Sequence, residues 1–238
     1  MSNILCFYTV YFTMNSTLEY LKNKQLIWHA TQAKETTGLD SSGFVELDKQ
    51  LGGGLPEQGL VDIQSPVGIG ELRLLLPYFK QRQERGLLVF IAPPMPLNSE
   101  MLAEFGLALE NILIIQANNE QERLWSAEQC LKSACCQSVL MWHKVMQVHH
   151  IRRLQLAAEK GGALQIILRP HQSSSIGLPV SLGLKLAAQP LGIEVHITKR
   201  KGAWPGKPFT VNMAAHWPQL TLAKTSNNIV HFPHAHVS

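Results

Sequence analysis

Short apolar runs alternate with longer helical stretches through most of the chain, and this alternation limits the fold more than any other feature. The strand-like runs are Leu60–Gln64, Leu87–Ala92, Asn111–Gln116, Ser138–Trp142 and Leu164–Arg169, and the helical stretches between them are Gly70–Arg85, Ser99–Leu109, Glu120–Cys135 and Val148–Lys160. Such alternation is typical of right-handed βαβ units around a parallel sheet. Wholly apolar runs such as Ile112–Ile115 indicate strands buried on both faces. The sequence therefore predicts an α/β fold with a mainly parallel sheet covered by helices.

The pattern changes after Pro170. Three more strands are predicted without helices between them, at Val180–Ala187, Ile193–Thr198 and Phe209–Met213. Consecutive strands without crossover helices favour antiparallel pairing, and hence a small carboxy-terminal antiparallel extension at one sheet edge. We divide the chain into an amino-terminal helix and linker (1–41), a core (42–178), an antiparallel basic extension (179–224) and a mobile tail (225–238).

The segment after the first predicted strand is similar to a phosphate-binding loop that lacks its chemical groups. A working loop ends in Gly-Lys-Ser/Thr, because backbone N–H groups surround the phosphates, Lys neutralises them and the hydroxyl binds Mg²⁺. Here Glu71 replaces the Lys. Turning this attraction into a repulsion costs on the order of 8 kcal/mol per phosphate charge at about 4 Å and a dielectric near 20, and less if Glu71 turns outward to water. We interpret the segment as a vestigial nucleotide loop and predict no cofactor; its positions are Ser65, Gly68, Gly70, Glu71 and Leu72.

Several motifs resemble known bacterial families. Residues 42–170 resemble the RecA-like core in order and spacing, through Ser42–Asp48, Leu51–Pro56 and Gly59–Ile63 before the loop. The inner part also resembles the SOS cell-division inhibitor SulA, through Leu74–Pro77, Ile91–Pro93, Ser138–Trp142 and Ile166–Pro170. With Gly68–Pro77 and the late Ile197–Gly202 segment, residues 16–215 resemble the ImuA family. The resemblance implies a RecA-like P-loop NTPase fold with a degenerate Walker A motif.

Two further positions depart from an active RecA-like core. The strand Leu88–Ala92 should deliver a catalytic carboxylate near its end, to activate water, but Pro93 and Pro94 follow it. The strand Val139–Met141 should end in an Asp for Mg²⁺, but Trp142 and His143 follow it. Phosphoryl transfer depends on positioning and electrostatics, and these groups are missing. We therefore predict no catalytic residue and no ATPase activity.

The ImuA resemblance implies a non-catalytic adaptor in SOS-induced translesion DNA synthesis. Its implied partners are an ImuB-like polymerase-related subunit and an error-prone replicative-type DNA polymerase, with RecA and DNA as further candidates. One alternative is a SulA-like inhibitor that binds the division protein FtsZ. A third, an active DNA-dependent ATPase, rests on fold analogy alone. The implied location is cytoplasmic, with nucleoid association when the protein is bound to the repair complex.

The carboxy-terminal third carries the positive charge. From Lys160 onward there are eight Lys and Arg and one acid, Glu194, so this part has a net charge of +7. Cations can follow a phosphate backbone and an aromatic ring can stack on a base. The alternative is a solvated hairpin end with its Trp packed on the domain. The DNA-binding candidates are Lys199, Arg200, Lys201, Trp204 and Lys207.

The amino-terminal segment Ser16–Ala30 is predicted as a helix with an apolar stripe. Such a stripe can dock in a partner's groove or pack on the chain's own core, and we keep both alternatives. The partner-binding candidates are Leu18, Leu21, Ile27 and Trp28. The apolar run before this helix is too short to span a bilayer. We predict no metal site, because the adjacent pair His149 and His150 points in different directions on a helix.

Overall fold

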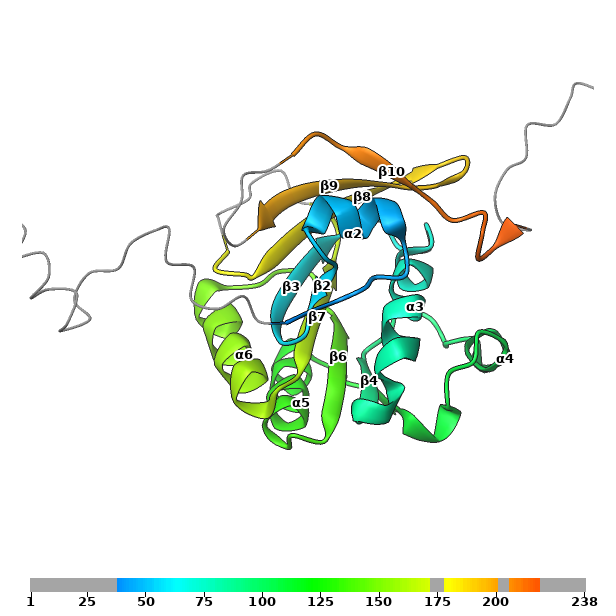
Figure 1. Ribbon diagram of the computed structural model, residues 1–238. Coiled ribbons are helices and arrows are strands. Elements are labelled where there is room, and N and C mark those ends of the chain that lie inside the picture. Colours follow the sequence, from blue (N-terminus) through cyan, green and yellow to red (C-terminus); the bar gives the residue numbers. More distant parts are fainter. Residues whose placement is uncertain (1–37, 172–177, 201–205, 219–238) are drawn as a thin grey trace, which may run out of the picture. The chain divides into compact units, whose positions relative to one another are not determined.

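The computed structural model describes residues 38–171, 178–200 and 206–218 (Figure 1). The helices are α2 (Val45–Leu51), α3 (Glu71–Arg82), α4 (Ser99–Glu104), α5 (Glu120–Lys132) and α6 (Val148–Gly161), and the 3₁₀ turns are η1 (Gln83–Arg85) and η2 (Leu109–Asn111). The strands are β1 (Leu39–Asp40), β2 (Leu55–Pro56), β3 (Gly59–Gln64), β4 (Leu87–Ile91), β5 (Ile112–Ile115), β6 (Cys136–Trp142), β7 (Leu164–Arg169), β8 (Leu182–Gln189), β9 (Gly192–Arg200) and β10 (Phe209–Asn212).

One eight-stranded sheet carries the fold, in the order β10-β9-β8-β3-β7-β6-β4-β5. The six strands from β8 to β5 are parallel, which confirms the predicted α/β fold with a mainly parallel sheet. Antiparallel pairing is confined in this sheet to β8–β9 and β9–β10. The predicted extension is therefore antiparallel only in part, because its first strand, β8, runs parallel to β3 and continues the central sheet.

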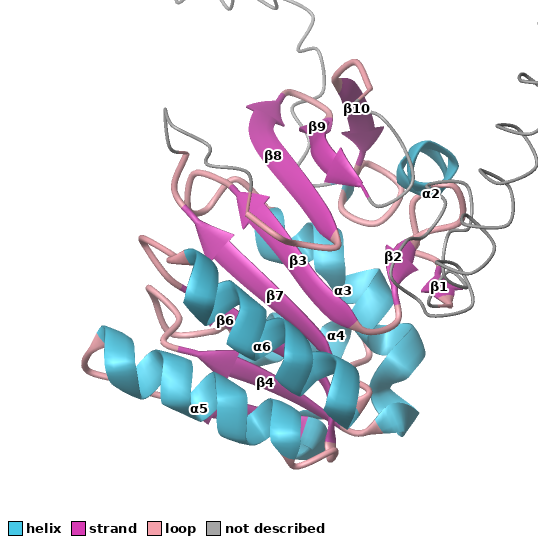
Figure 2. Cartoon of the chain, turned by 90° about the vertical axis from the view of Figure 1, so that its left-hand side faces the viewer, coloured by secondary structure: helices cyan, strands magenta, loops and turns pink. Residues whose placement is uncertain are grey.

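Helices cover both faces of the sheet. In Figure 2, α5 and α6 lie on the near face, and α3 and α4 lie behind it. Side chains alternate along each strand, so neighbouring residues enter different cores. In β4, Phe90 packs with α3, whereas Val89 and Ile91 pack with α5 and α6. Both cores are apolar, which explains the continuous apolar run of β4 and the apolar stretches Val139–Met141 in β6 and Ile166–Leu168 in β7.

Two predicted helices end earlier than expected. The helix predicted for Ser99–Leu109 ends at Glu104, because Gly106 takes a left-handed φ of 91° and its N–H bonds to the Ala103 carbonyl. The helix predicted to reach Cys135 ends at Lys132, shortly before Ala134 takes a positive φ of 56°. In both cases a left-handed residue after the last turn ends the helix.

Helix α2 was not predicted. Its seven residues form where the sequence analysis identified only a motif before the loop. Asp48 lies within the helix and holds the preceding residues in a turn. Its carboxylate accepts hydrogen bonds from Ser41 Oγ at 2.5 Å and from Ser42 N–H at 2.7 Å. Seven residues are too few to show a helical repeat of apolar side chains, and the hydrogen bonds of Asp48 cannot be read from such a repeat. Among the helices of the described residues, none combines the length and apolar composition needed to cross a bilayer.

Candidate functional site

A cavity of about 400 Å³ lies at the carboxyl edge of the parallel strands. Parallel strands end at the same edge, and Figure 2 shows the arrowheads of β3 and β7 pointing to the same side. Open α/β sheets bind ligands at this edge. The residues that line the cavity come from the ends of five strands and the segments after them: Ser65, Val67, Glu71, Ala92, Pro93, Pro94, Gln116, Ala117, Arg123, Trp142, His143, Lys144, Leu168, Arg169 and Pro170.

Glu71 turns toward the β3–α3 loop and not outward to water. Both of its carboxylate oxygens accept the Gly68 N–H at 3.1 Å, and the residue is only 6% exposed. Gly70 precedes α3 in a left-handed conformation, and Glu71 is the first residue of the helix. A carboxylate is stabilised here by the positive end of the helix dipole. The Gly68 N–H of this loop is therefore bonded to the protein's own carboxylate.

The other positions of this loop have structural roles. Ser65 is buried, its N–H donates to the Arg169 carbonyl at 2.9 Å, and its hydroxyl donates to the Pro66 carbonyl. Leu72 packs against the apolar core on the α3 face and is absent from the cavity lining. Leu72 therefore has a packing role, at the position where a working phosphate-binding loop has a Ser or Thr hydroxyl.

The far wall of the cavity is formed by α5 and the end of β6. Pro93 and Pro94 line the cavity at the end of β4, and Trp142 and His143 line it at the end of β6. His143 is 2% exposed, and its burial lowers the pKa of the imidazole below its usual range. The ring is therefore neutral at physiological pH. From the sequence, these strand ends were expected to lack catalytic and Mg²⁺-binding carboxylates, and Arg123 was not predicted as a site residue.

A buried ion pair lies beside the cavity. Arg169 donates to Asp62 through two bonds, from Nε to Oδ1 at 2.6 Å and from Nη2 to Oδ2 at 2.8 Å. Both side chains are nearly inaccessible, at 4% and 6% exposure. The pair joins β3 to β7, and the Arg169 carbonyl also accepts the Ser65 N–H. It therefore fixes the start of the β3–α3 loop relative to the neighbouring strand.

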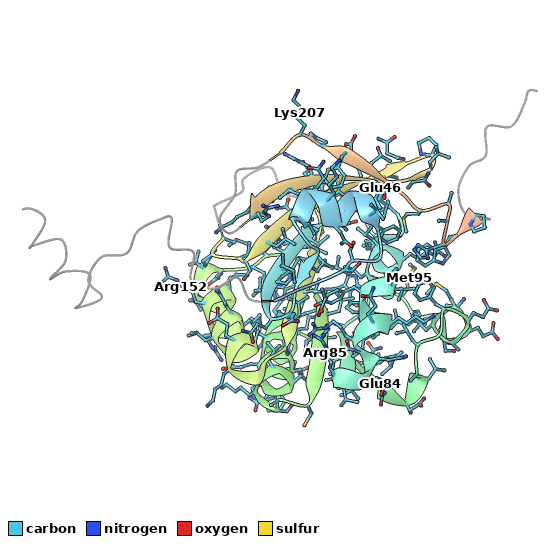
Figure 3. All side chains as sticks on the ribbon, viewed as in Figure 1. Glu46, Glu84, Arg85, Met95, Arg152 and Lys207 are labelled. Atoms are coloured by element: carbon cyan, nitrogen blue, oxygen red, sulfur yellow. The ribbon has the colours of Figure 1, made fainter. Side chains whose placement is uncertain are left out.

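The predicted DNA-binding residues are only partly within the described chain. Lys199 Nζ donates to the Leu178 carbonyl at 2.6 Å, and Arg200 Nη1 donates to the Gln50 carbonyl at 2.7 Å, at the end of α2. Lys207 points outward beside β10, and Arg152, on α6, projects far from it (Figure 3). The other two candidates, Lys201 and Trp204, lie outside the described residues, as do Leu18, Leu21, Ile27 and Trp28.

The strand β5 presents an apolar surface that the sequence analysis missed. The run Ile112–Ile115 was predicted to be buried on both faces, but Leu113 and Ile114 are 42% and 46% exposed. The prediction was wrong because β5 is the last strand of the sheet, with β4 on one side only. On α5, Trp125 is 63% exposed. Edge strands with exposed apolar side chains are templates for pairing with another chain.

The fold and the cavity define an α/β protein built on a mainly parallel sheet, and about 42% of the chain is homologous to RecA and SulA. The chain is 30% identical over 101 residues to Protein RecA of Picosynechococcus sp. This alignment covers 42% of the chain and 29% of that RecA. It is 32% identical over 103 residues to cell division inhibitor SulA of Photorhabdus laumondii, which covers 43% of this chain and 58% of SulA.

The match therefore spans less than two thirds of either relative. The crystal structure of SulA from Pseudomonas aeruginosa is 27% identical and aligns with 47% of this chain and 98% of its own, with a TM-score of 0.42. No protein-family profile matches the chain.

Proposed function

We propose that this protein is a non-catalytic RecA-like adaptor in SOS-induced translesion DNA synthesis. It would assemble an error-prone polymerase complex by binding other proteins. The basic residues between Lys199 and Lys207 would in addition bind DNA. The proposal that the protein is non-catalytic rests on Glu71, whose buried carboxylate accepts a hydrogen bond from the Gly68 N–H. The homology to RecA and SulA supports a role in the SOS response.

Three wall positions of the cavity support the proposal that the protein does not catalyse ATP hydrolysis. Glu71 brings a negative charge to the loop, Pro93 and Pro94 stand after β4, and His143 stands after β6. None of these side chains supplies the loop Lys, the general base or the Mg²⁺-binding carboxylate that ATP hydrolysis needs. We propose that the RecA-like fold here is retained as a P-loop core with a degenerate Walker A motif, and that it serves as a scaffold.

An adaptor needs protein-binding surface, and the edge strand β5 offers one. Leu113 and Ile114 are exposed on it, and nothing among the described strands pairs with its outer side. We propose that an ImuB-like subunit binds here or at the amino-terminal stripe, in a cytoplasmic, nucleoid-associated complex with an error-prone replicative-type polymerase and RecA. Changing both side chains to Lys is expected to weaken binding of the ImuB-like subunit at least about tenfold, measured with purified proteins, because charge disfavours apolar edge pairing.

ATP binding tests the non-catalytic part. The purified full chain is expected to give no measurable heat with ATP–Mg²⁺ up to about 1 mM, because binding would bring phosphate charge against Glu71. Phosphate release with single-stranded DNA is expected to stay at the level of buffer. A dissociation constant of about 1 mM or tighter, together with hydrolysis that Glu71→Gln changes, contradicts the proposal.

The second candidate function is a SulA-like inhibitor of FtsZ. The homology to a protein named cell division inhibitor favours it, over 103 residues. Against it stand β8, β9 and the basic residues Lys199 and Arg200, which extend the sheet beyond the core. If the chain blocks FtsZ polymerisation in a light-scattering assay and does not bind the ImuB-like subunit, the adaptor proposal is wrong.

A further inference from the structure

Two thiols are in contact where α5 ends and β6 begins. Cys130 lies on the last turn of α5, and Cys136 is the first residue of β6. Their side chains are hydrogen-bonded to each other. Cys136 belongs to the apolar core on the α5 and α6 face of the sheet, and Cys130 packs against the same core. The pair lies at the amino edge of the sheet, so it is separate from the cavity at the carboxyl edge.

The turn between the two cysteines holds them in place. The Ser133 hydroxyl donates to the Cys130 carbonyl at 2.7 Å and lies 3.8 Å from Cys136 Sγ. The Cys135 N–H donates to Ser133 Oγ at 3.2 Å, and the Cys135 carbonyl accepts the Leu87 N–H of β4 at 2.8 Å. A disulfide forms only where the two side chains approach closely. Because these thiols are in contact in the folded chain, little backbone movement is needed to join them.

Cys136 is the more reactive member of the pair. The hydrogen bond from Cys130 lowers the pKa of the Cys136 thiol to about 7, against the opposite effect of burial. About half of the Cys136 side chains are therefore thiolate at neutral pH, and the thiolate is the form that reacts with oxidants. Cys136 is 6% exposed, so only a small oxidant reaches it. The same hydrogen bond raises the pKa of Cys130, which keeps a neutral thiol beside the thiolate.

We propose that Cys130 and Cys136 form a redox site, which hydrogen peroxide converts reversibly to a disulfide. The Cys136 sulfur attacks one peroxide oxygen and the O–O bond breaks, so that a sulfenic acid forms and the other oxygen takes up a proton and leaves as water. The Cys130 sulfur then attacks the sulfenic sulfur. The S–S bond forms, the S–O bond breaks, and the hydroxyl leaves as water with the Cys130 proton. Both thiols are oxidised, the peroxide is reduced, and a reducing dithiol restores the pair.

The disulfide ties the last turn of α5 covalently to the first residue of β6. Cys130, Cys135 and Cys136 are all free thiols in the structure, which is therefore the reduced form of the site. Where a cell keeps its thiols reduced, disulfides are usually transient and belong to catalytic or redox-sensing sites. The redox site is independent of the adaptor role, since neither partner binding nor the absence of ATP hydrolysis requires it.

Hydrogen peroxide tests the site on the purified full chain. The chain is treated at neutral pH, the remaining thiols are alkylated, and the tryptic peptides are identified by mass spectrometry. Trypsin cleaves after Lys132, so Cys130 is on one peptide and Cys135 and Cys136 are on the next. The two peptides are expected to appear as one disulfide-linked species after peroxide, and separately after reduction with dithiothreitol. Non-reducing electrophoresis is expected to show a monomer, because both cysteines of the pair belong to one chain.

Variants at two neighbouring cysteines identify the partner of Cys130. Cys136→Ala is expected to lower the yield of the linked species at least about tenfold, because the reactive thiolate is lost. Cys135→Ala is the matched control and is expected to leave the yield unchanged, since the exposed Cys135 thiol donates to the Ser133 carbonyl at 3.4 Å. If Cys136→Ala fails to fold, Cys135→Ala decides alone, because Cys136 is then the only cysteine on its peptide. The proposal is overturned if no linked species forms, if it forms only between chains, if it survives Cys136→Ala, or if Cys135→Ala abolishes it.

Discussion

Replacing Asp62 with Ala is expected to lower the free energy of unfolding by about 3–5 kcal/mol. The change removes the carboxylate that Arg169 reaches through two bonds, at 2.6 and 2.8 Å, in a site where both side chains are nearly inaccessible. Without this carboxylate the buried Arg169 guanidinium strongly destabilises the folded state, because water cannot replace the lost hydrogen bonds. Urea or guanidinium denaturation, followed by circular dichroism, measures the difference.

An exposed ion pair gives the matched control. Arg85 Nη1 lies 3.5 Å from Glu57 Oε1, and their side chains are 48% and 40% exposed. Glu57→Gln is expected to cost less than about 1 kcal/mol, because water screens and replaces this contact. The double variant Asp62→Leu/Arg169→Met is expected to recover most of the loss, since apolar side chains of similar size avoid the desolvation cost. Equal losses for Asp62→Ala and Glu57→Gln would contradict this account of the buried pair.

The central strands were predictable because burial on both faces leaves a strong signal. In β4 each residue packs against one of two apolar cores, so the sequence there is continuously apolar. The same kind of apolar run led to a wrong prediction of burial on both faces for β5. A run such as Ile112–Ile115 does not report whether a strand is central or last in the sheet, and the position of β5 is set by crossovers that no local pattern records. The parallel pairing of β8 with β3 escaped prediction for the same reason.

The site was predictable in position but not in content. The strand ends that should carry catalytic groups do meet at one cavity, and Glu71 does stand at its loop. Sequence spacing gave no sign that Glu71 folds back onto the Gly68 N–H, because this depends on the left-handed conformation of Gly70. Arg123 was missed because it lies within a helix, at no motif position. Its contribution arises only where α5 passes the end of β6.

The contact between α5 and α6 gives the last prediction, and it opposes helix propensity. Gly161 is the final residue of α6, and a Cβ there would lie 1.9 Å from the Leu131 carbonyl oxygen of α5. Propensity alone favours Gly161→Ala by about 1 kcal/mol, whereas forcing atoms into a packed contact costs about 1–3 kcal/mol and at times more. Since the obstacle is backbone, the clash is expected to dominate, with a net loss of about 2 kcal/mol in denaturation experiments.

Gly206→Ala is the matched control for this effect. A Cβ at Gly206 meets nothing within 4 Å, and its φ lies outside the left-handed range, so the new methyl group strains neither packing nor backbone. That variant is expected to be neutral or to stabilise the protein by about 0.4–1 kcal/mol, because Ala restricts the unfolded chain more than Gly. If Gly161→Ala proves as stable as Gly206→Ala, the ends of α5 and α6 are free to move apart. The close packing of these two helices would then contribute little to holding the wall that carries Arg123.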